Sequence, residues 1–231
     1  MNIRSRLCAL LLVSLLAGVQ AQAAGLADLS NKDAVAGLKE ALSKSSQAAV
    51  AALGKQDGFL GNARVRIPLP DGLQQLEGML RGLGMGKYAD ELITTMNRAA
   101  ESAVVEAKPL LVNAVKNMSV QDAKAILGGG DDAATQYFKR TTSEPLARKF
   151  LPIVAKATQK VKLADKYKEF AGKGAKFGLI DARDADLNAY VTRKALDGLF
   201  LMIADQERQI RRDPVGAASG IISKVFGAIG K

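Results

Sequence analysis

The chain has 231 residues, with 33 basic and 23 acidic side chains, no histidine, a single cysteine and a formal net charge of +10 at pH 7. The lack of histidine excludes Ser-His-Asp and Cys-His catalysis, and with one cysteine it also excludes an ordinary zinc site. A single cysteine cannot form a disulfide within the chain, so stability must come from packing.

The first 23 residues have the layout of a cleaved secretory signal. A basic head and an apolar run over residues 7–17 precede Ala21-Gln22-Ala23, whose small side chains suit a signal peptidase. The run is too short to span a membrane, and no later apolar stretch is long enough either. Cleavage would remove Cys8 and two arginines, lower the net charge to +8 and place residues 24–231 in the periplasm.

Residues 24–231 predict a single all-α domain of about seven helices, since they are rich in Ala, Leu, Lys and Glu and show little β-type alternation. A start signal at Ser30 predicts a first helix from about Asp33 to Leu53, which Gly54 can end. Turn residues and two prolines then predict an extended strap over residues 57–70.

Leucine spacing predicts a second helix from Asp71 to Leu83, which Gly84 and Gly86 break. The longest helix is expected from Tyr88 to about Met118, with Pro109 kinking or dividing it. Both breaks follow from residues that fit poorly inside a helix.

A capping box of Ser119 and Asp122 predicts a short helix to Leu127, ended by three glycines. Asp131 and Asp132 are expected to cap the helix that follows.

A separate helix is expected to start at Ser143 and Pro145, because proline is tolerated in a first turn. Its inward face is predicted to carry Leu146, Phe150, Ile153, Ala157 and Val161. Residues 172–184 are expected to form a loop, and a strong helix is predicted over residues 186–211. Asp213-Pro214 then starts a last helix.

Five segments follow one another in the order of a known family. They are DGFLGNARVRIPLP (57–70), NRAAE (97–101), DAKAILGGGDDAATQYFKRTT (122–142), YVTRKALDGLF (190–200) and IRRDP (210–214). Together they resemble the bacterial exported proteins called "domain of unknown function 4197". The resemblance implies an exported helical protein and no established activity, and it supplies no catalytic residues.

Asp131 and Asp132 follow a glycine-rich turn that superficially looks like a phosphate loop. Their negative charge opposes phosphate binding, which needs a positive helix end, and no Lys-Ser/Thr follows. We interpret the segment as a helix end, a turn and an acidic cap. A hard cation held by the two aspartates is the alternative, although further oxygen ligands are lacking.

Asn97, Arg98 and Glu101 share one side of the long helix beside small alanines. They predict either a buried polar network or one wall of a ligand-binding site. Without histidine, acid–base catalysis would fall to carboxylates, so Glu101, Asp131 and Asp132 are the candidates for it.

Basic charge is concentrated between Phe138 and Lys176, where 11 Lys or Arg accompany three acidic residues. Lys149, Lys156 and Lys160 form a stripe beside the apolar face of one helix. The stripe predicts either a solvated face or a site for anionic lipid headgroups or envelope polymers.

The last helix carries an apolar stripe over residues 221–229, which predicts docking on the domain or, alternatively, an interfacial helix. We predict a non-enzymatic periplasmic or envelope-associated protein that binds an anionic or hydrophobic, lipid-like ligand. A carboxylate-based hydrolase or lyase and a structural interaction protein are the alternatives. No cofactor, metal or nucleic acid is expected, and the oligomeric state is open.

Overall fold

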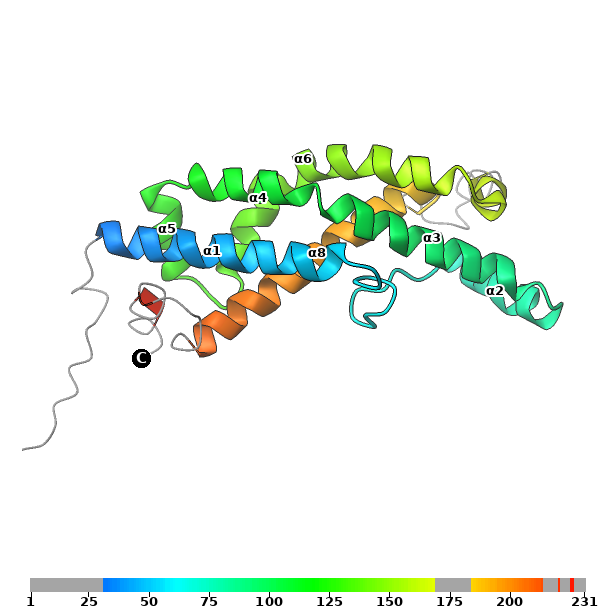
Figure 1. Ribbon diagram of the computed structural model, residues 1–231, viewed down its shortest axis with the longest axis horizontal. Helices are drawn as coiled ribbons and strands as arrows, with labels where there is room; N and C mark the ends of the chain where they lie inside the picture. The colour runs from blue at the N-terminus through cyan, green and yellow to red at the C-terminus, as the bar shows by residue number, and fades with distance from the viewer. Residues whose placement is uncertain (1–30, 169–183, 214–219, 221–224, 227–231) are drawn as a thin grey trace, which may run out of the picture.

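The computed structural model describes residues 31–168, 184–213, 220 and 225–226, and its secondary structure there is helical with no strand (Figure 1). The all-α prediction is therefore confirmed. Seven helices have defined bounds within these residues: α1 (Asn31–Gly54), α2 (Asp71–Gly82), α3 (Gly86–Val104), α4 (Ala107–Lys116), α5 (Val120–Leu127), α6 (Ala133–Thr158) and α8 (Leu187–Arg212). Residues 162–168 are also helical.

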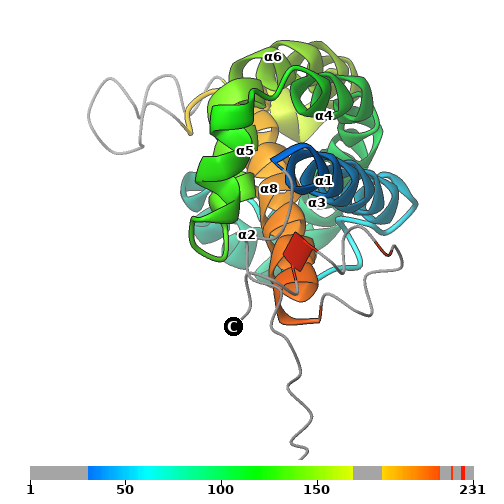
Figure 2. The same ribbon diagram turned by 90° about the vertical axis from the view of Figure 1, so that its left-hand side faces the viewer.

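Helix α8 occupies the middle of the molecule, and the end view in Figure 2 shows α1, α4, α5 and α6 around it. It packs against α6, α1 and α3, and α6 also packs against α3. Helix α2 folds back along α3 to form a projecting hairpin at one end (Figure 1). No helix in the described ranges has both the length and the apolar character needed to cross a membrane.

The long helix was predicted to be kinked or divided at Pro109, and the structure shows it divided into α3 and α4. The break falls at Val105 and Glu106 because a proline ring collides with the carbonyl four residues before it. Pro109 itself lies in the first turn of α4, where a missing N–H costs no intrahelical bond. Gly84, with φ at 73°, makes the turn after α2. Gly86 was expected to break a helix, but it is the first residue of α3.

The prediction of a separate helix starting at Ser143 and Pro145 is wrong, because α6 runs unbroken from Ala133 to Thr158 with two prolines inside it. The hydroxyls of Thr142 and Ser143 donate to carbonyls four residues earlier, at 2.6 Å each. Hydroxyl bonds of this kind often accompany a slight bend in a helix. Burial on both sides of that proline outweighs its local cost. The large apolar side chains that α6 buries are Tyr137, Phe138, Leu146, Phe150 and Val154.

Two predicted helix starts are confirmed. Ser119 and Asp122 form a capping box at α5. The Asp186 carboxylate accepts the N–H groups of Asn188 and Ala189 at the start of α8.

The predicted signal over residues 1–23, the Ser30 start signal, most of the loop over 172–184 and most of the last helix lie outside the described residues. Of the predicted C-terminal stripe, Val225 and Phe226 are buried, in agreement with docking on the domain.

Candidate functional site

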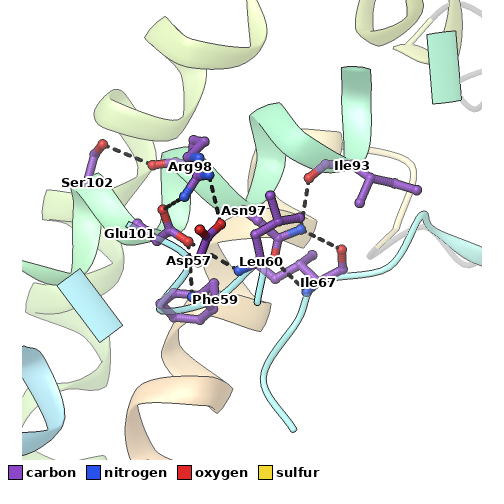
Figure 3. Close-up of polar contacts among 9 residues, drawn as sticks. All are labelled: Asp57, Phe59, Leu60, Ile67, Ile93, Asn97, Arg98, Glu101 and Ser102. Carbon is purple, nitrogen blue, oxygen red and sulfur yellow. Dashed lines mark hydrogen bonds and ion pairs between the residues drawn. The ribbon is translucent and has the colours of Figure 1, made fainter. Parts of the chain in front are cut away.

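The polar cluster predicted on α3 consists of Asn97, Arg98 and Glu101. It holds the strap, residues 57–70, against the helix (Figure 3). One oxygen of Glu101 accepts the N–H groups of Phe59 and Leu60, each at 3.1 Å. Its other oxygen is 2.7 Å from Arg98, which also pairs with Asp57 at 2.8 Å. The pKa of Arg98 is raised, mainly by its hydrogen bond to Glu101. Glu101 is only 5% exposed, so these donors replace the water that its carboxylate loses on burial.

Asn97 fastens the far end of the strap and is fully buried. Its side-chain oxygen accepts the N–H of Ile67 at 2.8 Å. Its amide nitrogen donates to the carbonyls of Ile67 at 2.9 Å and Ile93 at 2.8 Å. An asparagine amide thus pairs with one strap residue as a neighbouring strand would, which explains why a Pro-rich segment keeps a defined path without forming a sheet.

Helix α8 holds the strap from the other side. The hydroxyl of Tyr190 donates to the carbonyl of Pro68 at 3.1 Å. The ring of Phe59 lies so close to Gly198 that a β-carbon there would stand 2.7 Å from it. The strap therefore joins α3 to α8, and Gly198 is required by this close approach.

Alkaline pH is expected to destabilise the fold through Tyr167 and Tyr190. Burial raises the pKa of each to about 12, and their hydroxyls donate to the carbonyls of Asp184 and Pro68. In the unfolded chain both titrate near 10. Unfolding therefore releases protons between about pH 10 and pH 12, and stability falls as the pH rises through that window.

Urea denaturation at pH 8, 10 and 11 measures the effect. Tyr167→Phe should flatten the dependence, and an unchanged slope would contradict the assignment.

The geometry of the α3 cluster accounts for a structural network, and the predicted ligand-binding role of Asn97, Arg98 and Glu101 stays a prediction. Neither a hydrogen bond nor an ion pair joins Glu101 to Asp131 or Asp132 within the described residues. These same residues contain no group of three or more acidic side chains placed to hold a metal ion.

The prediction that Asp131 and Asp132 cap α6 with their side chains is wrong. Asp132 stands at the cap position but makes no capping bond, and it accepts instead from the side chain of Gln136 at 2.7 Å. The cap is Glu207 of α8, which accepts the N–H groups of Ala134 and Thr135 at 2.9 Å each. The buried carboxylate of Glu207 already accepts the N–H groups at the start of α6. Asp131 and Asp132 are exposed to solvent.

Glu207 is also paired with Arg211, whose nearest nitrogen is 3.0 Å away. Arg211 further donates to the carbonyl of Ile126 at 2.9 Å and lies over the ring of Phe226. This pair thus joins α8 to α5, α6 and the C-terminal segment. Sequence reasoning missed it, although an acidic residue and an arginine four apart on the apolar side of a helix were a visible signal.

A polar cavity of about 380 Å³ lies between α4, α5 and α6. Arg140 pairs there with Asp122 at 3.2 Å and lies 5.5 Å from the centre of the Tyr137 ring. The pKa of Asp122 is lowered, chiefly by its hydrogen bond from Ser119, and burial raises the pKa of Tyr137. The segment over residues 122–142 thus forms one wall of a polar cavity.

An apolar groove of about 550 Å³ lies between α6 and α8. Its walls come from two helices that are some 40 residues apart in sequence. The lining residues are Ser143, Glu144, Ala147, Arg148 and Leu151 from α6, with Ala189, Thr192, Arg193 and Leu196 from α8. Leu151, one of the aliphatic residues in this lining, is 42% exposed.

The predicted lysine stripe is exposed and lies away from this groove. Lys149, Lys156 and Lys160 all face solvent. At 3.6 residues per turn, Lys149 and Lys156 stand roughly 160° around α6 from the groove-lining residues. The basic side chains at the groove are instead Arg148, paired with Glu144, and Arg193, paired with Asp184. Whether the lysine stripe binds a partner stays a prediction.

By its fold and cavities, this molecule is a helical domain with an apolar groove and with a strap that buried polar groups hold in place. A family model described as "Protein of unknown function (DUF4197)" matches residues 28–227, and the chain belongs to this family. Neither the curated proteins nor the solved structures contain a significant match.

Proposed function

We propose that this protein binds an amphipathic ligand whose apolar chain lies in the groove between α6 and α8. The observation that carries the proposal is the groove itself, which is about 550 Å³ in volume and whose exposed lining surface is mostly apolar. This volume falls in the range of small-molecule sites, which are mostly apolar with a few polar groups. Covering Leu151 with a ligand would remove exposed apolar surface from water.

Two arginines at the groove favour a ligand with a negative headgroup. Arg148 comes from α6 and Arg193 from α8, so they stand on opposite walls. Arg148 is paired with Glu144 one turn away, and both side chains are largely exposed. Exposed pairs of this kind contribute little to stability, so an anionic group can take the place of Glu144 at small cost. We therefore propose an anionic single-chain lipid as the ligand class.

The predicted secretory signal supports a location where such lipids occur, the cell envelope. In this proposal the groove works outside the cytoplasm, and the exposed lysines of α6 add a general attraction to anionic surfaces. Binding needs no catalytic group, which fits a chain without histidine.

Leu151→Asp is expected to weaken laurate binding at least tenfold, or about 1.4 kcal/mol, because it places a charge where the alkyl chain would lie. Isothermal titration calorimetry with the purified protein, below the micelle concentration of laurate, measures the affinity. Val120→Asp is the matched control, since Val120 is 53% exposed and is the first residue of α5. Absence of laurate binding to the unaltered protein, or equal loss in both variants, would overturn the proposal.

A further inference from the structure

The turn between α2 and α3 gathers exposed apolar side chains. Of the six large apolar side chains that are exposed in the described part of the chain, three lie within residues 79–85. They are Met79, Leu83 and Met85, which are 62%, 69% and 42% exposed. Single exposed apolar side chains are common on protein surfaces, but a cluster of them at one place marks a contact site. We call residues 78–86 the hairpin tip.

The outer side of the hairpin tip is open. A β-carbon added at Gly78, Gly82 or Gly84 would have no other part of the described domain within 4 Å. At 3.6 residues per turn, Gly78 and Gly82 lie on the side of α2 opposite the buried Leu73, and Met79 and Leu83 stand beside them. The domain itself therefore leaves this apolar face uncovered.

The charge of the hairpin tip is used within the hairpin. Arg81 is the one charged residue between Gly78 and Gly86, and it pairs with Glu77 at 2.7 Å and with Asp90 of α3 at 2.6 Å. Directly behind the tip, the ammonium of Lys87 lies 5.2 Å from the centre of the Tyr88 ring. Lysine and tyrosine side chains suit the boundary between lipid and water, because each has an apolar body and a polar end.

Basic charge at the same end of the molecule indicates what covers the tip. Residues 156–168 lie at the end from which the hairpin projects (Figure 1), and they carry five lysines and one aspartate. Lys156, Lys160, Lys162 and Lys168 are exposed. Such a cluster attracts anionic lipid headgroups. A stable protein interface buries about 800 Å² of each partner, more than three side chains on a projecting tip supply, whereas a bilayer surface needs only a few apolar anchors and positive charge.

We propose that the hairpin tip is a membrane anchor, which inserts Met79, Leu83 and Met85 below the headgroups of an anionic bilayer while the lysines of residues 156–168 contact the headgroups. The anchor shares no residue with the α6–α8 groove. It therefore goes beyond the proposed function, and the two can be tested separately.

Tryptophan fluorescence tests the insertion, since the chain has no tryptophan of its own. In Leu83→Trp, vesicles of equal parts phosphatidylethanolamine and phosphatidylglycerol should shift the emission to shorter wavelength, and brominated acyl chains should quench it. Val120→Trp is the matched control, because Val120 is also exposed but lies on α5 at the other end of the molecule (Figure 1). Its emission should stay unchanged.

Sedimentation with the same vesicles measures the affinity. The double variant Met79→Ser/Leu83→Ser should bind about tenfold more weakly, because two apolar anchors are lost. Both positions are exposed, so the variant should fold and should bind laurate as the unaltered protein does. Phosphatidylcholine vesicles should bind the unaltered protein more weakly than the anionic vesicles do, and equal binding would overturn the role given to the lysines.

Three outcomes would overturn the anchor. They are failure of the unaltered protein to sediment with anionic vesicles at low salt, absence of quenching in Leu83→Trp, and equal vesicle affinity of the serine variant. A two-chain species in solution that dissociates in the serine variant would assign the tip to a second copy of the chain and would overturn the anchor as well. Loss of laurate binding by the unaltered protein bears on the groove alone.

Discussion

Glu207→Gln is expected to lower the free energy of unfolding by about 3–5 kcal/mol, the cost of breaking a buried ion pair from one side. Glu207 is 4% exposed and accepts the N–H groups of Ala134 and Thr135 and the guanidinium of Arg211. The variant leaves the buried charge of Arg211 without its counter-ion. It also turns an amide nitrogen, which cannot accept, toward the start of α6. Urea denaturation followed by circular dichroism measures the loss.

Glu144→Gln is the control for that experiment. Glu144 also pairs with an arginine four residues away, but the pair is exposed, so no measurable change is expected. A loss below about 1 kcal/mol in Glu207→Gln would show that the cap at α6 is not what joins α8 to α5 and α6.

Asn97→Ala is expected to cost about 2–4 kcal/mol, because it removes three buried hydrogen bonds at once. The substitution leaves the N–H and the carbonyl of Ile67 without their partner in a region closed to water, and it removes the side-chain bond to the carbonyl of Ile93. Amide hydrogen exchange should rise in the strap before it rises in α6, since the backbone of Ile67 loses both of its hydrogen bonds to the Asn97 side chain.

Asn113→Ala is the matched control for Asn97→Ala. Asn113 is exposed on α4, and its side chain accepts one hydrogen bond from Asn117. Its loss should leave stability unchanged. If Asn97→Ala proves as mild as Asn113→Ala, the strap is held mainly by Phe59, Glu101 and Tyr190. Neither asparagine lines the α6–α8 groove, so lipid affinity should be the same in both variants.

Local pattern predicted most of the helices correctly. The 3.6-residue spacing of apolar side chains, the Ser119–Asp122 capping box and the Asp186 start are properties of neighbouring residues. Pro109 divides a helix for an equally local reason, the collision of its ring with the preceding turn. The same reasoning failed at Pro145, because the burial of Phe138 and Phe150 on either side is a tertiary effect.

The candidate sites are formed mainly by contacts between residues that lie far apart in the sequence. The cluster at Asn97 and Glu101 was visible as polar residues beside alanines, but its partners in the strap lie 30 to 42 residues away. The cap at α6 comes from Glu207, 73 residues beyond Ala134. Backbone N–H groups carry no sequence signature, so a side chain that satisfies them cannot be found by motif.

By itself the sequence determined an all-α fold with a Pro-rich strap, and a chain without histidine, because composition and spacing act over a few residues. Only the tertiary structure decided where the apolar groove lies. It forms where α6 and α8 meet but fail to close over Leu151, and that depends on how two distant helices cross. The same crossing buries Thr192 without a partner, which no local pattern can show.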